Sequence, residues 1–388
     1  MGNITRKKRK ICVVVFSRAN YGRIKAVLRE INNHPDLELL LVVGASALLW
    51  RFGDITDIIK KDGFEVAETV YSIVEGEKPV TMAKSTGMGI IELATIFENL
   101  KPDIVLTVAD RFETVATAIA ASYMNIPVAH TQGGEVTGSI DESVRHAITK
   151  FSHIHFPATE KAADRIIKMG EDPTSVFMTG CPSIDLLKDL DSELSGNVFS
   201  KYDVAIDDLN PSQPFLLCLQ HPVTTEYSSG LFQINETLKA VANIKMPAVW
   251  LWPNADAGSD DIAKGLRIFK EEYKNSNIHF FLNFTPEDYA SLLLNTKCII
   301  GNSSSSIREG SFLGSPAVNV GTRQNGRERG ENVIDVNYCA EEIENAIRKQ
   351  LSNGYYEPDH LYGDGNAAVR IASILTEVEI KIQKRLTY

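Results

Sequence analysis

The chain has 388 residues, a length that suits two domains of roughly 100–200 residues each. Apolar residues make up 44% and charged residues 23%, which excludes a disordered, collagen-like or low-complexity protein. The net charge of −10 gives no general attraction to nucleic acid or to anionic membranes, so an anionic ligand needs a local cluster of donors. No apolar segment approaches the ~20 residues of a membrane span, and the first apolar run, ICVVVF, is too short for a signal peptide. We therefore expect a cytoplasmic protein.

The five cysteines are odd in number and widely spaced, and three of them, Cys12, Cys218 and Cys298, lie inside apolar strand-like runs. We interpret them as small buried side chains in a reducing compartment. No CxxC or HxxxH pair indicates a metal site. His153 and His155 share one face of a strand-like run, but no third ligand accompanies them. We predict no metal and no cofactor.

Short apolar runs alternate with longer amphipathic segments along the whole chain, a pattern typical of parallel sheets covered by helices on both faces. Strands are predicted near 11–16, 37–43, 103–108, 127–130 and 153–157, then near 215–219, 248–252, 278–282, 298–300 and 317–320. Helices between the first five strands are predicted near 20–33, 46–61, 79–99, 112–124 and 139–150. The fold class is therefore α/β, with two Rossmann-like doubly wound domains in succession.

A polar stretch from Asp189 to Pro214, rich in Asp, Ser and Asn, separates the two halves of this pattern. We place the N-terminal domain at 1–183 and the C-terminal domain at 184–365. In open α/β sheets, ligands bind beyond the carboxyl ends of the strands. The informative side chains should therefore stand directly after each strand, in a crevice between the domains.

The turns of the first half carry two arginines suited to phosphate. Arg18 follows the first strand and opens a helix, where a guanidinium and free N–H groups can meet a phosphate. This turn lacks the GxGxxG spacing, so a nicotinamide or flavin cofactor is not indicated. Asp110 and Arg111 follow the strand near 103–108. Asp110 either caps the next helix or takes part in chemistry, and Arg111 is a second candidate phosphate ligand.

The strand near 127–130 ends in a loop with Gln132, two glycines and Glu135. The glycines let the backbone approach a ligand closely. Asp141 lies in the first turn of the next helix. Ser139 and Glu142, three residues apart, predict a capping box, which leaves Asp141 available for another role.

The second half carries the strongest element, a glycine followed by serines 303–306. Such a run at a helix start supplies N–H donors, hydroxyls and the positive end of the helix dipole, which suits a diphosphate. Glu309 can accept both hydroxyls of a ribose, and Arg323 adds a cation. His221 follows a buried strand by one residue and is held by Pro222, a position suited to proton chemistry. No Walker motif is present.

The residues alone therefore indicate a nucleoside-diphosphate ligand between two domains, with Asp110, Asp141 and His221 around its other end. At this level of detail the chain resembles a known family, the hydrolysing UDP-N-acetylglucosamine 2-epimerases. The segments that carry the resemblance are SRANYG, ADRFET, HTQGGEVTGSIDESVRHAITK, LQHPVTT, PNADAGS, IIGNSSSSIREG, GTRQNGRERGENV and YGDGNA. The sialic- and legionaminic-acid branch and the epimerase half of the animal bifunctional epimerase/kinase are the most similar.

The resemblance implies the glycosyltransferase-B fold, with a last helix near 366–388 that packs back on the first domain. It implies a UDP-sugar substrate and a homodimer or homotetramer, without nucleic-acid or membrane partners. The implied reaction releases UDP from UDP-N-acetylglucosamine and inverts carbon-2 through a 2-acetamidoglucal. The product, N-acetylmannosamine, serves the biosynthesis of sialic-acid-type sugars.

By position, the resemblance implies catalytic roles for Asp110, Asp141 and His221. The implied UDP-contacting residues are Arg18, Ala19, Arg111, Asn254, Phe284, Ser303, Ser304, Glu309 and Arg323. Many relatives have Glu where this chain has Gln132, and glutamine is neither acid nor base. Either Asp141 or Glu135 takes over that acid–base role, or Gln132 recognises a group of the substrate. We assign Gln132 and Glu135 to the sugar end of the site.

This departure leaves the sugar open, since a UDP-2,4-diacetamido-2,4,6-trideoxyglucose, as used for legionaminic acid, is a near alternative. Two readings from other classes are a glycosyltransferase of the same fold, which needs an acceptor site, and a nucleotide-sugar-binding protein without catalysis.

Overall fold

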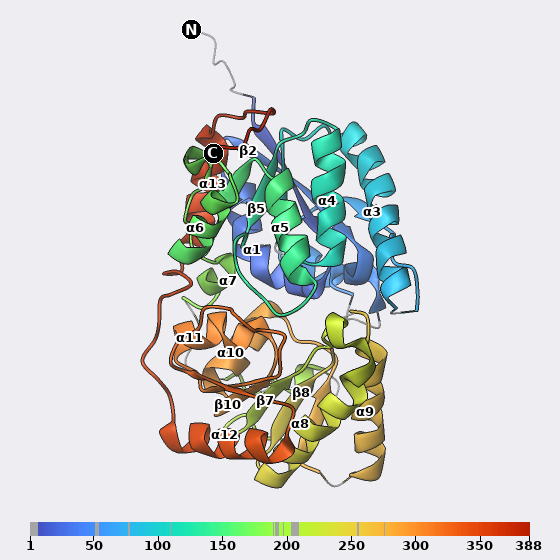
Figure 1. Ribbon diagram of the computed structural model, residues 1–388, viewed down its shortest axis with the longest axis vertical. Helices are drawn as coiled ribbons and strands as arrows, with labels where there is room; N and C mark the ends of the chain where they lie inside the picture. Colours follow the sequence, from blue (N-terminus) through green and yellow to red (C-terminus); the bar gives the residue numbers. More distant parts are fainter. Residues whose placement is uncertain are drawn as a thin grey trace.

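The computed structural model describes residues 7–50, 54–76, 78–108, 110–188, 190, 194–196, 198–202, 209–253, 256–274 and 276–388. Two six-stranded parallel sheets lie one above the other, each with helices on both faces (Figure 1). The first has the order β3-β2-β1-β4-β5-β6 and the second the order β12-β11-β10-β7-β8-β9. Read from its other edge, the second sheet repeats the order of the first, which is the doubly wound Rossmann arrangement. The predicted fold class is confirmed.

The strands of the first sheet are continuous apolar runs because helices cover them on both sides. They are β1 (Arg9–Val15), β2 (Leu37–Gly44), β3 (Val66–Val70), β4 (Ile104–Val108), β5 (Val128–Thr131) and β6 (Ile154–Phe156). The helices of this half are α1 (Arg18–Asn33), α2 (Thr56–Lys61), α3 (Pro79–Leu100), α4 (Phe112–Tyr123), α5 (Asp141–Phe151), α6 (Glu160–Lys168) and α7 (Pro182–Asp185), with short 3-10 turns η1 (Ala45–Leu48) and η3 (Pro173–Ser175).

The second sheet is built in the same way. Its strands are β7 (Leu216–Leu219), β8 (Ala248–Leu251), β9 (Ile278–Phe281), β10 (Cys298–Gly301), β11 (Ala317–Val320) and β12 (Val333–Val336). Its helices are α8 (Gly230–Ile244), α9 (Ser259–Glu272), α10 (Pro286–Asn295), α11 (Arg308–Leu313) and α12 (Ala340–Asn353), with 3-10 turns η4 (Ser200–Tyr202), η5 (Thr224–Ser229) and η6 (Ser304–Ser306).

After α12 the chain runs back along the molecule, and its last helix, α13 (Ala367–Glu377), lies beside α1 in the first half (Figure 1). Ile371 and Leu375 are fully buried in the same apolar core as Ile11 of β1. The Arg9 guanidinium donates to the carbonyl of Leu375 at 2.7 Å and so satisfies the C-terminal end of the helix. The domain boundary after residue 183 stays a prediction.

The structure differs from the prediction at two strands and one helix. The strands β3 and β12 were not predicted, because both are edge strands that are buried over only part of their length and interrupt their apolar residues with acidic ones. The single helix predicted over 46–61 is wrong. In the described parts of this stretch, 46–50 and 54–61, the chain forms the 3-10 turn η1 and the six-residue α2, and the Asp54 carboxylate accepts from the Thr56 N–H at 2.8 Å at the start of α2.

Within the described ranges, no helix is both long and apolar enough to cross a membrane. All five cysteine thiols are free, and burial raises the pKa of Cys12, Cys218 and Cys298 well above the ordinary range. In the part of the chain that the structure describes, no group of three or more His, Cys, Asp or Glu side chains is arranged to hold a metal ion. His155 instead pairs with the Glu171 carboxylate at 3.2 Å.

Candidate active site

The turns that follow β1 in the first half and β7, β9 and β10 in the second line one cavity. It encloses about 930 Å³ of space, part of which is open solvent. Eight residues predicted from sequence line it together: Arg18, Ala19, His221, Phe284, Ser303, Ser304, Glu309 and Arg323. Segments almost 300 residues apart in the chain thus meet at one site, as expected for the facing ends of two parallel sheets.

The serine run lies at the floor of this cavity. Its residues form the 3-10 turn η6 and precede the short helix α11, so the predicted helix start is wrong. The Ser303 side chain caps the turn by accepting from the Ser305 N–H at 3.3 Å. Because α11 has only six residues, the positive charge near the serines comes from arginine side chains and not from the dipole of a long helix. Arg23 donates to Ser304 Oγ at 3.0 Å, and Arg323 donates to the Asn302 carbonyl at 3.2 Å.

Glu309 carries an unpaired acceptor in the cavity wall. Its Oε2 atom is buried and has no hydrogen-bond partner among the residues that the structure describes. Buried acceptors in folded proteins are nearly always paired. A ligand with hydroxyl donors is the kind of partner that this oxygen can accept from.

Asp110 lies directly after β4, beside the cavity, and its carboxylate accepts from the Arg145 guanidinium. Arg23, which lines the cavity, approaches the same carboxylate at 3.8 Å. Burial opposes ionisation of Asp110, but the charges of Arg145, Arg23 and Arg327 outweigh it and hold its pKa well below the usual range. The helix-capping alternative is wrong, because the residue at the N-terminal cap of α4 is Arg111.

Asp141 opens α5 and lies 3.8 Å from the Arg323 guanidinium. Burial, followed by the negative charge of Asp110, raises the pKa of Asp141. The two neighbouring carboxyls are therefore pushed in opposite directions, a pattern typical of acid and base assignments at active sites.

The predicted capping box at α5 is wrong. Glu142 accepts from the Thr137 N–H at 2.7 Å instead of reaching back to the N–H of Ser139. The same carboxylate pairs with Arg145 at 2.9 Å. Glu142 thus holds the loop before α5 and the arginine that binds Asp110.

His221 is fixed through its backbone by Asn302. Its N–H donates to Asn302 Oδ1 at 2.7 Å, and the Asn302 amide returns a hydrogen bond to its carbonyl at 2.8 Å. Burial, followed by the nearby charges of Arg323 and Arg18, lowers the pKa of His221 well below its ordinary value. The imidazole is neutral near pH 7 and can accept a proton.

Five described residues that were predicted for the site lie outside the cavity wall: Asp110 and Asp141, described above, and Arg111, Gln132 and Glu135. Arg111 pairs with Glu113 at 3.1 Å and with Asp256 at 2.9 Å. Gln132 and Glu135 turn toward arginines of the second half, as described below. Asn254, also predicted, falls outside the described residues.

Arg23 was missed by the sequence analysis. It lies five residues after Arg18 on α1, and nothing in its local pattern distinguishes it from an exposed helical arginine. Its role in the site follows only from the fold, which places the side chains of Asp110 and Ser304, both distant in sequence, next to its guanidinium group.

With this geometry in hand, comparison with known proteins is informative. A family model described as UDP-N-acetylglucosamine 2-epimerase matches residues 29–376. The chain belongs to this family. A Legionella pneumophila relative, a UDP-N,N'-diacetylbacillosamine 2-epimerase (hydrolyzing), is 32% identical over 97% of each chain. A Neisseria meningitidis UDP-N-acetylglucosamine 2-epimerase is 29% identical over 97% of this chain and 98% of its own.

Solved structures of family members share the fold. The Methanocaldococcus jannaschii UDP-GlcNAc 2-epimerase in complex with UDP-GlcNAc and UDP has a TM-score of 0.78 and 18% identity, covering 95% of this chain and 99% of its own. The Neisseria meningitidis UDP-GlcNAc 2-epimerase bound to UDP-GlcNAc has a TM-score of 0.75 and 19% identity, covering 94% and 99%. These likenesses place the chain in the glycosyltransferase-B-like fold.

Proposed function

We propose that this family member is a hydrolysing epimerase that converts UDP-N-acetylglucosamine and water to N-acetylmannosamine and UDP. One observation carries the proposal. A cavity lined by serines, arginines and the unpaired Glu309 is bordered by two carboxyls of opposite pKa shift and a neutral histidine. The homodimer or homotetramer implied by the resemblance is likewise a proposal.

The nucleotide end uses the residues of the cavity wall. Ser303, Ser304, Arg18 and Arg323 bind the diphosphate through hydroxyl and guanidinium donors. Glu309 accepts from the ribose hydroxyls. Phe284 and the neighbouring leucines of the wall provide an apolar surface for the base.

The first chemical step is an elimination. The bond between carbon-1 and the diphosphate oxygen breaks, its electron pair leaves with UDP, and the carbon-2 proton passes to His221. Positive charge develops on the sugar ring in the transition state, and the ionised Asp110 stabilises it electrostatically. The product of this step is the 2-acetamidoglucal.

The second step adds water across the new double bond. Asp141 gives its proton to carbon-2 on the opposite face, while water adds to carbon-1 and returns a proton to Asp141. The configuration at carbon-2 is thereby inverted, and the free sugar is released. A raised pKa suits Asp141 to this role because it keeps the carboxyl protonated to higher pH.

A second substrate is supported by the relatives. The Legionella pneumophila protein and a Campylobacter jejuni GDP/UDP-N,N'-diacetylbacillosamine 2-epimerase (hydrolyzing), 31% identical over 84% of each chain, are named for the diacetylated sugar. That sugar carries a second acetamido group at carbon-4 in place of a hydroxyl. The same two steps apply to it unchanged, so the two substrates differ in recognition alone.

We test the reaction by incubating the protein with each sugar nucleotide in heavy water. We expect release of UDP and of the free 2-epimer, with deuterium at carbon-2 detected by proton NMR. Retention of the original hydrogen would exclude elimination. UDP release only in the presence of an acceptor would indicate a glycosyltransferase, and binding without release would indicate a nucleotide-sugar-binding protein. The ratio of kcat/KM values identifies the preferred sugar.

The diphosphate assignment predicts a loss of UDP affinity in Arg323→Ala. Hydrogen bonds to charged groups contribute about 1.5–3 kcal/mol, so we expect Kd to rise by roughly 10–150-fold in isothermal titration calorimetry. Arg348→Ala is the matched control, because Arg348 forms an exposed pair with Glu344 on α12, remote from the cavity. An unchanged Kd in Arg323→Ala would move the diphosphate to another part of the site.

A further inference from the structure

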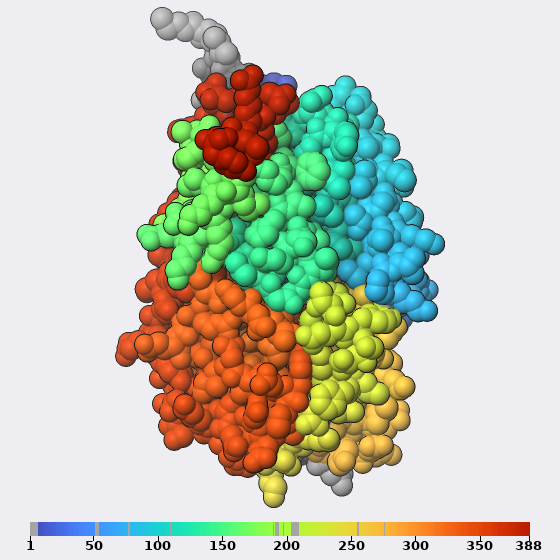
Figure 2. Space-filling view, viewed as in Figure 1, coloured from blue at the N-terminus to red at the C-terminus, as the bar shows by residue number. Residues whose placement is uncertain are grey.

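The two halves meet along a seam beside the cavity (Figure 2). The loop between β5 and α5 of the first half lies against the loop that follows β11 of the second. The Gly138 N–H donates to the Arg323 carbonyl at 3.0 Å, a direct backbone contact between the halves. Thr159 adds a hydrogen bond to the Glu328 carboxylate at 2.7 Å. This part of the seam is therefore held by polar contacts, while Ile184 and Leu187 of the first half pack with Ala290 and Ile307 of the second in a buried apolar cluster.

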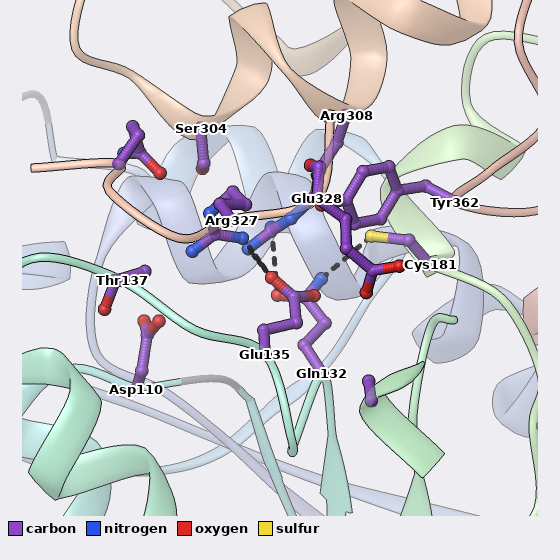
Figure 3. A network of polar contacts seen from close by, with 12 residues as sticks. Asp110, Gln132, Glu135, Thr137, Cys181, Ser304, Arg308, Arg327, Glu328 and Tyr362 are labelled. Carbon is purple, nitrogen blue, oxygen red and sulfur yellow. Dashed lines mark hydrogen bonds and ion pairs between the residues drawn. The ribbon is translucent and has the colours of Figure 1, made fainter. Parts of the chain in front are cut away.

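Glu135 lies at the centre of this seam and is 3% exposed (Figure 3). Its Oε2 atom accepts from Arg308 Nη2 at 2.9 Å and from Arg327. Both cations belong to the second half, and both are buried. Arg308 also donates to the Gln132 amide oxygen at 3.1 Å. A carboxylate of one half thus neutralises two buried cations of the other, which would otherwise repel one another in a medium of low dielectric constant.

The same residue is connected to the catalytic carboxyl. Arg145 donates to the Glu135 carbonyl at 2.7 Å and to the Asp110 carboxylate. Docking of Glu135 on the second half therefore fixes the arginine that orients Asp110. Arg327 also contributes to the low pKa of Asp110, so the charge state of the site depends on contact between the halves.

Gly138 shows how closely the halves approach. A Cβ atom at this position would lie 2.0 Å from the Thr322 carbonyl oxygen, a backbone atom that cannot rotate away. The φ angle of Gly138 lies outside the left-handed region, so its own backbone conformation accepts alanine. The absence of a side chain is needed only because the second half lies against it.

The residues that we place against the substrate expose little surface, although the cavity beside them opens to solvent. Asp110, His221 and Ser304 are 6%, 4% and 6% exposed. Enzymes that sequester their substrates commonly open for entry and close for the reaction. The contacts of Glu135 join the two halves in the arrangement described here.

We propose that Glu135 is a positioning residue that holds the two halves closed by binding Arg308 and Arg327, and that Gly138 permits this closure. Closure then sets Asp110 against the sugar through Arg145. Gly138 and Glu135 both lie outside the cavity wall. Gly138→Ala removes no group assigned to the substrate and therefore carries the test. Glu135→Gln supports it, since Glu135 was assigned to the sugar from the sequence.

The test compares the radius of gyration by small-angle X-ray scattering with saturating UDP. We expect Gly138→Ala and Glu135→Gln to be larger than wild type, and Gly87→Ala to match it. Gly87 is the matched control, because it lies on α3 and a Cβ there would meet no atom within 4 Å. UDP affinity should be unchanged in Gly87→Ala. Because Gly138→Ala displaces Thr322, the neighbour of the cavity residue Arg323, the UDP concentration is set from the measured Kd of each variant. A Gly138→Ala protein as compact as wild type with UDP bound would overturn the proposal.

Turnover provides a second readout, which rests on the proposed function. A misplacement of about 1 Å at a reacting centre can lower the rate about 10²-fold, so kcat should fall by that order in Gly138→Ala while KM changes little. A loss confined to KM would also overturn the positioning role. If wild type releases no UDP from either sugar nucleotide, the proposed function is wrong. The scattering experiment still shows whether Glu135 and Gly138 are needed for the two halves to close.

Discussion

Asp110→Asn is expected to lower the turnover number by about 10²–10⁴-fold, the usual size of electrostatic and acid–base effects in enzymes. Asparagine keeps the shape of the side chain and an oxygen that can accept from Arg145. It removes the negative charge that stabilises the developing cation on the sugar ring. UDP affinity should change little, because Asp110 does not line the nucleotide end of the cavity. Steady-state kinetics and calorimetry on the same preparation measure both quantities.

The matched control is Asp364→Asn, the same chemical change in an exposed pair with Arg370. Its kcat should equal that of wild type. A thermal melt establishes that Asp110→Asn is folded. Near-normal turnover in the folded Asp110→Asn protein would remove this carboxylate from the chemistry and leave it as a partner of Arg145 alone.

The central strands of both sheets were predictable because helices cover them on two faces. Such strands need continuous apolar residues, as in Ile11–Val15 and Leu216–Leu219, and these runs are easily recognised. The edge strands β3 and β12 need apolar residues on part of their length only, so their sequences resemble loops. The order of the strands follows from the doubly wound topology and not from any local pattern.

The cavity wall was predictable for a related reason. Residues directly after parallel strands share one edge of a sheet, so Arg18, Ser303 and Arg323 could be grouped without coordinates. The partners of Gln132 and Glu135 could not, because Arg308 and Arg327 stand 176 and 192 positions away in sequence. Which arginine meets which acceptor depends on how the two halves dock, and local sequence does not encode it.

The protonation of the two carboxyls could not be predicted from the sequence either. The sequence analysis placed Asp110 and Asp141 near the sugar but did not decide which of them is the acid and which the base. The structure separates them by their partners. Asp110 is surrounded by arginines, which lower its pKa. Asp141 lies 3.8 Å from Arg323, and burial and the charge of Asp110 raise its pKa. The pKa values of the two carboxyls are therefore shifted in opposite directions.

This separation predicts a specific pH dependence for Asp141→Asn. In wild type, turnover requires Asp141 to carry its proton, so kcat falls as pH rises through the pKa of Asp141. Because that pKa is raised, the protonated form persists to higher pH than for an ordinary aspartate. The falling limb of the plot of kcat against pH therefore shifts in the alkaline direction. Asparagine cannot donate this proton. We expect kcat to drop by about 10²–10⁴-fold and the residual activity to lose this limb.

Asp364→Asn should keep both the rate and the limb of wild type, since its carboxylate lies on the surface, remote from the cavity. The pH profile distinguishes a proton donor from a residue that merely shapes the loop before α5. A structural role would lower kcat equally at every pH and leave the limb in place. If the pH dependence of kcat is unchanged in Asp141→Asn, another group supplies the proton. His221 is then the next residue to test, because Asp110 is ionised and has no proton to give. Loss of the limb together with the drop in kcat assigns the proton that inverts carbon-2 to Asp141.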